Sequence, residues 1–361
     1  MKAAVLHHSP GELSIEDVSL DKPGPREVLV RVAATGLCHS DLHYLERAYE
    51  LKGPMILGHE GAGRVEAVGS DVTYVRPGDH VIAYLAGFCG SCEWCLAGRM
   101  TLCPRVGLSR GNDEAPRIRL SDGRPCLQFA GLSTFAEEML IHENTVVKID
   151  PDIPLDRAAL VGCAVPTGVG AVIRTAKVTP GATVAVIGCG GVGLNCIQGA
   201  VIAGARRIVA IDINDGKLAT ARDFGATDTI NNSDGTALEQ LDACLPGEGG
   251  VDYSFEALGS AQTYELAFSI LRPGGTATVI GVASGTFTLP TGPFLAERRI
   301  QGCIMGSVRF RQDLPYLLDL YRAGRLKLDE LVSKRIPLEQ INEGYAAISD
   351  GSVARSVVVF D

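Results

Sequence analysis

A histidine and a carboxylate stand side by side in the glycine-flanked stretch Gly58-His59-Glu60. A neutral imidazole is the commonest protein ligand for metal ions, and the carboxylate of Glu60 could join the same ion intermittently or support it. Cys38 lies upstream and Cys163 lies far downstream. Two thiolates and one imidazole leave the fourth position of a tetrahedral zinc ion open, so this set of residue types predicts a catalytic zinc site.

A second group of cysteines falls within residues 89–103, at Cys89, Cys92, Cys95 and Cys103. Four thiolates can close a tetrahedral shell on one ion and leave no position for substrate, so this spacing predicts a structural zinc site that holds a polar lobe together. An iron–sulfur cluster is the alternative, but the known ferredoxin spacings differ from this one.

The segment Gly36–Leu45 departs from the strand-like pattern around it. It predicts a short helix that Ser40 or Asp41 could cap. His43 taken alone is as well explained by a surface position, but its place just after Cys38 and Ser40 favours a functional role. The helix would gather Cys38, His39, Ser40, Asp41 and His43.

A phosphate-binding pattern begins at Thr183–Ile187, a buried strand followed by a glycine-rich loop and an alanine-rich helix. A second strand, Ile208–Ile211, ends at Asp212. Strand, G-x-G-x-x-G, helix, strand and terminal acid together are typical of a dinucleotide site, with the pyrophosphate at the helix N-terminus. Asp212 would accept hydrogen bonds from the ribose hydroxyls and repel an extra phosphate, which predicts NAD rather than NADP. The loop residues are Gly188, Cys189, Gly190, Gly191, Val192 and Gly193.

The elements that position these sites fall into two patterns. Residues 1 to about 150 read as short strands separated by turns, whereas strands and helices alternate from Thr183 to a last apolar strand near Ile300–Met305. This predicts an α/β protein with a β-rich domain and a doubly wound parallel sheet. The chain end, Ser356–Phe360, reads as a strand that returns to the first domain. We expect a discontinuous first domain of residues 1–164 and 306–361, and a nucleotide domain of residues 165–305.

Composition narrows the possible partners. The chain has 361 residues and a net charge of −9, which argues against nucleic acid because such proteins carry basic patches. It contains no apolar run long enough to span a bilayer and no signal peptide, so the expected compartment is the cytoplasm. The polar segment 104–128 is predicted as a long loop, which either borders the substrate entrance or is a solvated surface loop.

The sequence resembles the medium-chain, zinc-dependent alcohol dehydrogenase family over essentially its full length. The resemblance rests on Gly58-His59-Glu60-x2-Gly63-x5-Gly69-x2-Val72, the four-cysteine lobe and the Gly188–Gly193 loop. It implies a GroES-like catalytic domain, a Rossmann domain, NAD, and two zinc ions per chain. The long segment after the lobe is similar to the dimeric branch that includes glutathione-dependent formaldehyde dehydrogenase.

The resemblance also implies residue roles. Cys38, His59 and Cys163 would ligate the catalytic zinc, Glu60 would transiently replace its water, and Asp41 would orient His59. Ser40 and His43 would form a proton relay. Cofactor contacts would come from His39, Thr167, Asp212, Lys217 and Arg355. The substrate pocket would be lined by Tyr49, Leu85, Phe129, Ala130 and Val282.

These features predict an NAD-dependent dehydrogenase for apolar primary alcohols, aromatic or of medium to long chain. Leu85 and Ala130 are smaller than the residues the family often has there, which predicts a wide inner pocket. Two alternatives stay open. One is a glutathione-dependent formaldehyde dehydrogenase. The resemblance disfavours it, because Tyr49 stands where that enzyme has an acid for the glutathione amine and Gly107 stands where it has an arginine for a glutathione carboxylate. The other is a non-enzymatic zinc module fused to a nucleotide-sensing domain. The apolar strand near Ile300–Met305 would leave a sheet edge that either pairs in a homodimer or lies under a local loop.

Overall fold

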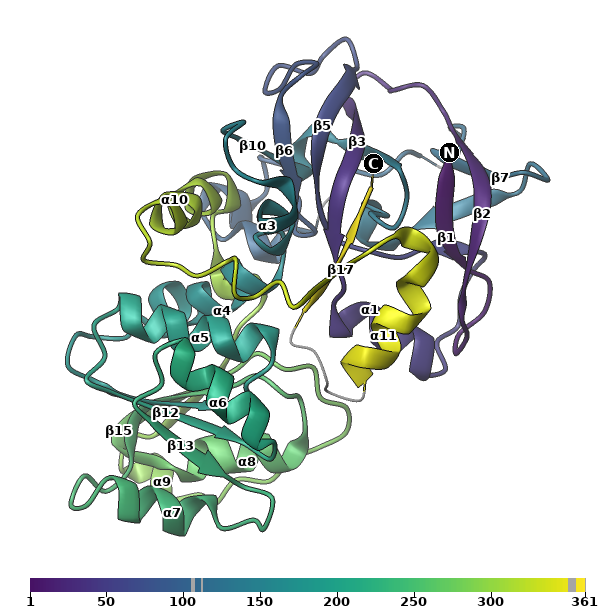
Figure 1. Ribbon diagram of the computed structural model, residues 1–361. Coiled ribbons are helices and arrows are strands. Elements are labelled where there is room, and N and C mark those ends of the chain that lie inside the picture. The colour runs from purple at the N-terminus through teal and green to yellow at the C-terminus, as the bar shows by residue number, and fades with distance from the viewer. Residues whose placement is uncertain (105–107, 112, 350–354, 361) are drawn as a thin grey trace. The chain divides into compact units, whose positions relative to one another are not determined.

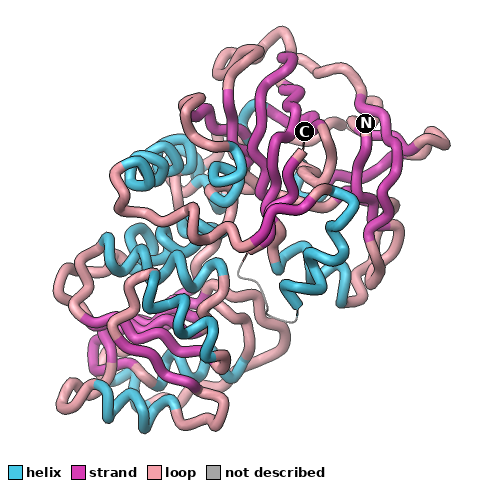
Figure 2. Tube along the Cα trace, viewed as in Figure 1, coloured by secondary structure: helices cyan, strands magenta, loops and turns pink. Residues whose placement is uncertain are grey.

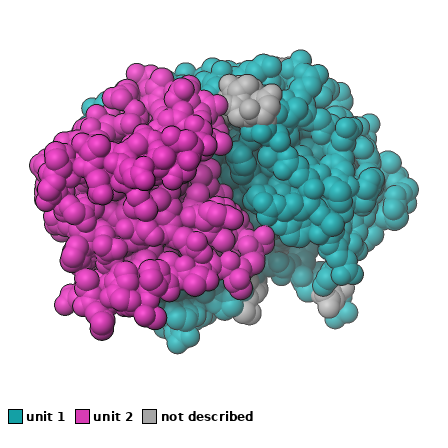
Figure 3. All heavy atoms as spheres, turned by 90° about the horizontal axis from the view of Figure 1, so that it is seen from below, with its two compact units in different colours: residues 1–163, 309–361 teal, residues 164–308 magenta. Residues whose placement is uncertain are grey.

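The computed structural model describes residues 1–104, 108–111, 113–349 and 355–360. The chain divides into two compact units, coloured separately in Figure 3. Unit 1 contains residues 1–163 and 309–361, and unit 2 contains residues 164–308. All the cysteines and histidines expected to bind metal belong to unit 1, and the glycine-rich loop belongs to unit 2.

Unit 1 is built mainly from strands, drawn in magenta in Figure 2. Five of them close a barrel in the order β1-β2-β7-β8-β4. The inner face of the barrel is apolar, and four of the five residues of β1 are buried. The barrel strands are β1 (Lys2–Leu6), β2 (Leu13–Leu20), β4 (Met55–Ile56), β7 (Ile118–Leu120) and β8 (Pro125–Gln128).

A seven-stranded sheet forms the rest of the β structure of unit 1, in the order β10-β6-β5-β3-β18-β17, with β9 also paired to β3. The last strand of the chain returns to this sheet, because β18 pairs antiparallel with the end of β3. The strands are β3 (Glu27–Gly36), β5 (Glu60–Val68), β6 (His80–Ala83), β9 (Glu138–His142), β10 (Val146–Ile149), β17 (Lys334–Ile336) and β18 (Ser356–Val359).

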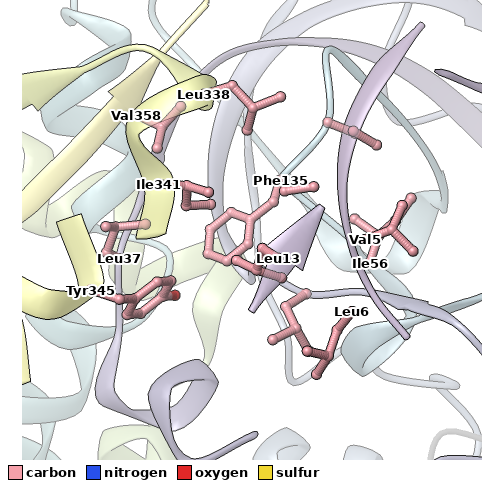
Figure 4. Packing of buried hydrophobic residues seen from close by; sticks show 14 of the residues in the cluster. Val5, Leu6, Leu13, Leu37, Ile56, Phe135, Leu338, Ile341, Tyr345 and Val358 are labelled. Atoms are coloured by element: carbon pink, nitrogen blue, oxygen red, sulfur yellow. The ribbon is translucent and has the colours of Figure 1, made fainter. Parts of the chain in front are cut away.

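Several helices of unit 1 pack against the strands of its sheets. Helix α11 packs against a core cluster that includes Leu37, Phe135 and Val358 (Figure 4). None of the helices in the described part of the chain is long and apolar enough to cross a membrane. The helices are α1 (His39–Glu46), α2 (Glu93–Leu96), α3 (Leu155–Leu160), α10 (Phe310–Arg322) and α11 (Ile341–Ser349), with short 3-10 turns at Met100–Leu102, Phe129–Gly131, Glu143–Thr145 and Leu338–Gln340.

Unit 2 is a six-stranded parallel sheet in the order β13 (Asp228–Asn231), β12 (Arg207–Asp212), β11 (Thr183–Ile187), β14 (Val251–Glu256), β15 (Leu271–Val279) and β16 (Arg299–Gly302). The strand order reverses at β11, with α5 (Gly191–Ile202) above the sheet and α7 (Ala237–Cys244) below it in Figure 1. Such a reversal opens a crevice at the carboxyl ends of the two central strands. The predicted α/β class with a doubly wound sheet is therefore confirmed.

The elements of unit 2 alternate as the sequence pattern indicates. In chain order they are α4 (Ala164–Gly170), a π-helical segment (Ala171–Ala176), β11 (Thr183–Ile187), α5 (Gly191–Ile202), β12 (Arg207–Asp212), α6 (Asp215–Asp223), β13 (Asp228–Asn231), α7 (Ala237–Cys244), β14 (Val251–Glu256), α8 (Ala261–Ser269), β15 (Leu271–Val279), α9 (Gly292–Leu295), β16 (Arg299–Gly302) and a 3-10 turn (Met305–Ser307).

Three local expectations were wrong. The segment 104–128 is not one loop, because it contributes β7 and β8 to the barrel; strands of three and four residues are too short to give a periodic signal. The edge strand ends at Gly302, where its partner strand also ends at Val279, and the positive φ of Met305 turns the chain away soon after. Helix α1 is not capped by Ser40 or Asp41: Cys38 is its N-cap, and the Asp41 carboxylate bonds elsewhere.

Candidate functional site

The predicted metal ligands converge in unit 1. Cys38 follows β3 at the start of α1, His59 stands between β4 and β5, and Cys163 follows α3. One donor atom from each of these residues and from Glu60 lies within 4.8 Å of every other. Gly36 makes room for this cluster, because a Cβ there would collide with the Glu60 carboxylate.

The geometry around His59 fits a metal ion. The side chain is completely buried, and its Nε2 atom has no hydrogen-bond partner. A buried nitrogen without a partner is costly, and a metal bond would satisfy it. The other nitrogen, Nδ1, lies 3.2 Å from Oδ1 of Asp41, which also accepts a 3.0 Å bond from the Gly58 backbone. The carboxylate therefore fixes the ring with Nε2 toward the two thiols.

The electrostatics of the cluster favour a thiolate. A hydrogen bond from Cys163 holds the pKa of Cys38 well below its usual value, against the effect of burial, and His59 adds to the lowering. The same hydrogen bond, together with burial, raises the pKa of Cys163. Burial works against protonation of His59, but Asp41 and Cys38 outweigh it and raise its pKa. The two sulfurs thus share one proton, which a bound cation would displace.

Glu60 is held by an arginine that the sequence pattern did not connect to it. Arg355, directly before β18, places Nη1 3.0 Å from Oε1 and 3.1 Å from Oε2 of Glu60, and 2.7 Å from the carbonyl of Leu37. Burial nevertheless raises the pKa of Glu60 to about 8, with Arg355 opposing. Arg355, predicted as a cofactor contact, is 5% exposed and bonded to Glu60 in unit 1.

The four cysteines of the lobe form the second cluster, with all four sulfurs within 4.8 Å of one another. Cys89 and Cys95 are 3.9 Å apart at sulfur, and Cys92 and Cys103 are 3.8 Å apart. A tetrahedral zinc ion with Zn–S bonds of about 2.3 Å requires sulfurs about 3.8 Å apart. Backbone N–H groups of Ser91 and Cys92 lower the pKa of Cys89 to about 6, whereas burial raises that of Cys95 to about 12. The spacing fits one ion and is too tight for a four-iron cluster.

The proposed relay residues lie on α1. The Ser40 hydroxyl is 3.7 Å from the Cys38 sulfur. His43, one turn further, is half-buried, and burial and then Arg47 lower its pKa, so its imidazole is neutral at neutral pH. His39 is exposed at the first position of the helix.

A row of aromatic rings leads from the surface to the metal cluster. Tyr49, 39% exposed, stacks on Tyr44 at 4.6 Å between ring centroids. Tyr44 meets Phe129 edge-on at 5.2 Å, and Phe129 meets the His59 ring at 5.6 Å. Ala130, next to Phe129, has a left-handed backbone with φ 52°. Of this row, Tyr44 was missed; its spacing of four residues from Ser40 puts both on one face of α1 and could have indicated it.

Two of the predicted pocket residues lie outside this row. Leu85 is partly buried against the core cluster of the seven-stranded sheet. Val282 belongs to unit 2 and is 63% exposed. Gly107, which bears on glutathione binding, lies outside the described residues.

The residues predicted to bind the dinucleotide lie at the carboxyl ends of β11 and β12 in unit 2. Gly188 has a φ of +91°, and a Cβ on Gly193 would collide with the carbonyl oxygen of Gly188. The turn into α5 therefore requires both glycines. Asp212 is 6% exposed and accepts bonds from the backbone N–H groups of Cys189, Ile213 and Asn214 at 2.8, 2.8 and 3.1 Å. The carboxylate is thereby fixed beside the loop.

Further predicted cofactor contacts lie on helices of the same unit. Lys217 is in the first turn of α6, where its backbone N–H bonds to the capping side chain of Asn214 at 3.2 Å. Thr167 lies on α4, 7% exposed, with its hydroxyl 3.6 Å from the sulfur of Met305.

Comparison with known families identifies both parts of the chain. Residues 24–151 match the alcohol dehydrogenase GroES-like domain, and residues 191–323 match the zinc-binding dehydrogenase domain. An S-(hydroxymethyl)glutathione dehydrogenase of Saccharomyces cerevisiae is 39% identical, covering 99% of this chain and 96% of its own. An alcohol dehydrogenase class-3 of Pisum sativum is 40% identical, covering 99% and 97%.

Solved structures agree with these matches. The benzyl alcohol dehydrogenase of Acinetobacter calcoaceticus superposes with a TM-score of 0.91 at 30% identity, covering 100% of this chain and 99% of its own. An alcohol dehydrogenase zinc-binding domain protein of Burkholderia ambifaria superposes with a TM-score of 0.94 at 34% identity, covering 100% and 98%.

Proposed function

Because the chain belongs to the medium-chain, zinc-dependent alcohol dehydrogenase family, we propose that it transfers hydride reversibly between NAD and apolar primary alcohols, aromatic or of medium to long chain. The observation that carries this substrate class is the row Tyr49, Tyr44 and Phe129, which ends against His59. Aromatic rings bury large apolar area and stack on other rings, so the row suits a benzylic or alkyl group.

The cofactors are NAD and two zinc ions. Cys38, His59 and Cys163 would hold the catalytic ion, and the four lobe cysteines the structural one. A zinc ion with an open position acts as a Lewis acid that lowers the pKa of an alcohol hydroxyl, and NAD accepts the hydride.

The remaining roles fall to side chains of α1 and its neighbours. Ser40, beside Cys38, would accept the hydroxyl proton, and the neutral imidazole of His43 would pass it to solvent. Asp41 would keep His59 in its ligating orientation. In unit 2, Asp212 and Lys217 would bind the adenosine ribose, and the N-terminus of α5 would receive the pyrophosphate.

Oxidation of S-(hydroxymethyl)glutathione is the second candidate, since relatives of that name or class are 39–40% identical over nearly the whole chain. Recognition of that substrate would need charged partners for the peptide's ammonium and carboxylates. Tyr49 instead offers a partly exposed aromatic ring at the position where the glutathione-dependent enzyme has an acid.

A substrate panel separates the two candidates. NADH formation would be measured with ethanol, hexanol, benzyl alcohol, and formaldehyde plus glutathione. We expect benzyl alcohol or hexanol to exceed ethanol and the glutathione adduct in kcat/KM. A clear preference for the adduct would establish the second candidate, and a preference for ethanol would refute the apolar pocket.

Variants test the pocket residues. Tyr44→Leu and Phe129→Leu should each lower kcat/KM for benzyl alcohol by about 2- to 10-fold, the value of an aromatic contact. The matched control is Tyr316→Leu, on the exposed face of α10. Leu85→Phe should shift preference toward ethanol, because the larger side chain would narrow the inner pocket that Leu85 is proposed to line.

We also propose a homodimer in a reducing compartment. The strand β16 is the last of its sheet, with its outer edge unpaired among the described residues, and Leu295 just before it is 92% exposed. None of the eleven cysteines, all within the described residues, forms a disulfide, which suits a reducing compartment such as the cytoplasm. Pairing of two β16 edges across a two-fold axis would cover this surface. A monomer mass in solution at micromolar concentration would contradict the dimer.

A further inference from the structure

The C-terminal helix α11 brings a tyrosine to the back of the catalytic cluster. Tyr345 is 2% exposed and packs with Leu37 and Ile341, which Figure 4 shows beside it, and meets Phe135 edge-on at 6.1 Å. Helix α11 can sit this close because the preceding residue is Gly344, whose added Cβ would lie 2.6 Å from Leu37. The tyrosine is therefore locked in place next to α1.

Two buried polar atoms in the region where α1 and α11 pack together have no hydrogen-bond partner among the described residues: Oδ2 of Asp41 and the hydroxyl of Tyr345. Oδ1 of Asp41 already accepts from Gly58 and His59. Oδ2 lies 3.1 Å from the same His59 nitrogen, but that nitrogen has only one hydrogen to share. A buried polar atom without a hydrogen bond destabilises the folded protein, so both atoms need a partner.

The two atoms are suited to each other. Burial raises the pKa of Tyr345 well above its ordinary value, and the nearby negative charge of the Asp41 carboxylate adds to the effect. The phenol therefore keeps its proton and is available as a hydrogen-bond donor to a nearby acceptor. Asp41 is the carboxylate that orients His59, so any group that fixes Asp41 also fixes the imidazole.

We propose that Tyr345 is a positioning residue for the catalytic metal: its hydroxyl donates to Oδ2 of Asp41 and so holds the chain Tyr345–Asp41–His59 in register with Cys38 and Cys163. The C-terminal helix thereby acts on a metal ligand almost three hundred residues earlier in the sequence. This inference rests on the proposed assignment of the catalytic zinc ligands. A purely packing role for Tyr345 would depend on the ring alone, so removal of the hydroxyl separates the two.

The test compares Tyr345→Phe with the wild type as zinc-loaded full-length protein. Zinc release to a chelator should be biphasic, one phase for each ion. In the variant the catalytic phase should be up to about 10-fold faster, the lower end of the effect seen when a partner of a metal-ligating histidine is removed. The structural phase, from the four-cysteine lobe, should not change and serves as an internal control.

A second readout and a matched variant complete the experiment. With cobalt in the catalytic site, the visible absorption bands should shift in Tyr345→Phe, because the imidazole is less well oriented. The control is Tyr321→Phe, which removes a phenol 3.2 Å from the Asp329 carboxylate elsewhere in unit 1 and should leave both readouts unchanged. Equal release of the catalytic ion in wild type and Tyr345→Phe, or equal acceleration of both phases, would overturn the proposal. A wild type with a single zinc would instead contradict the metal assignment itself.

Discussion

Glutamate 27 should contribute several kcal/mol to the stability of unit 1. It is 5% exposed at the start of β3 and binds two arginines of the segment 104–128, Arg110 at 2.6 Å and Arg117 at 2.7 Å. Burial alone would raise its pKa, but Arg110, the Gly24 N–H and Arg117 outweigh it and lower the pKa from 4.5 to about 2. At about 1.4 kcal/mol per pKa unit, this corresponds to about 3 kcal/mol at neutral pH.

Glu27→Gln removes the negative charge that the guanidinium groups of Arg110 and Arg117 both contact. Arg117 is only 7% exposed, so its charge would be left buried without this partner. We expect a loss of about 3–5 kcal/mol in unfolding free energy at pH 7, as for other buried ion pairs that lose one partner. Denaturant unfolding can be followed by the single tryptophan, Trp94, which lies in unit 1. The control Glu66→Gln breaks a surface pair with the 56%-exposed Arg31 side chain and should cost less than about 1 kcal/mol.

The stabilisation from Glu27, measured as unfolding free energy, should decrease as the pH falls. Because the pKa of Glu27 is lower in the folded state, its contribution is complete above pH 4.5 and declines as the pH falls toward 2. The difference between wild type and Glu27→Gln should therefore shrink between pH 5 and pH 3. A difference below about 1 kcal/mol at pH 7, or one that stays constant with pH, would refute this reasoning.

The remaining predictions concern the cofactor and the lobe. Asp212→Ala should weaken NAD binding and admit NADP, because the carboxylate that faces the added phosphate is lost; a wild type that reduces NADP as well as NAD would contradict this role. The variant should also lose some stability, since three backbone N–H groups lose their acceptor. Cys95→Ser should lower the thermal midpoint and solubility and remove one zinc per chain, as metal analysis and calorimetry would show.

Local sequence patterns predicted the nucleotide unit well. The glycine spacing, the apolar strand Thr183–Ile187 and the terminal Asp212 carry their signal within about thirty residues, and the structure places them as a strand, turn, helix and strand. The cysteine spacing of the lobe is equally local.

Contacts between distant segments carried no such signal. Tyr44 and Phe129 meet through the folding of the barrel, and Arg355 reaches Glu60 only because β18 returns beside β3. Likewise, the sequence pattern predicts only a loop for the arginines of the segment 104–128. Their partner Glu27 is far away in the sequence, at the start of β3, so the pattern gives no sign of these ion pairs. Side-chain pairing of this kind depends on tertiary register, which residue types and spacing do not specify.

The proposed mechanism requires that Cys38, His59 and Cys163 hold a catalytic zinc distinct from the zinc of the four-cysteine lobe. It is tested most directly by measuring zinc content and benzyl alcohol turnover on the same samples of wild type and Cys163→Ser. We expect two zinc ions per chain and turnover in the wild type, and one zinc ion, a folded chain and no turnover in the variant. A Cys163→Ser protein that keeps both zinc ions or turns over normally would contradict it.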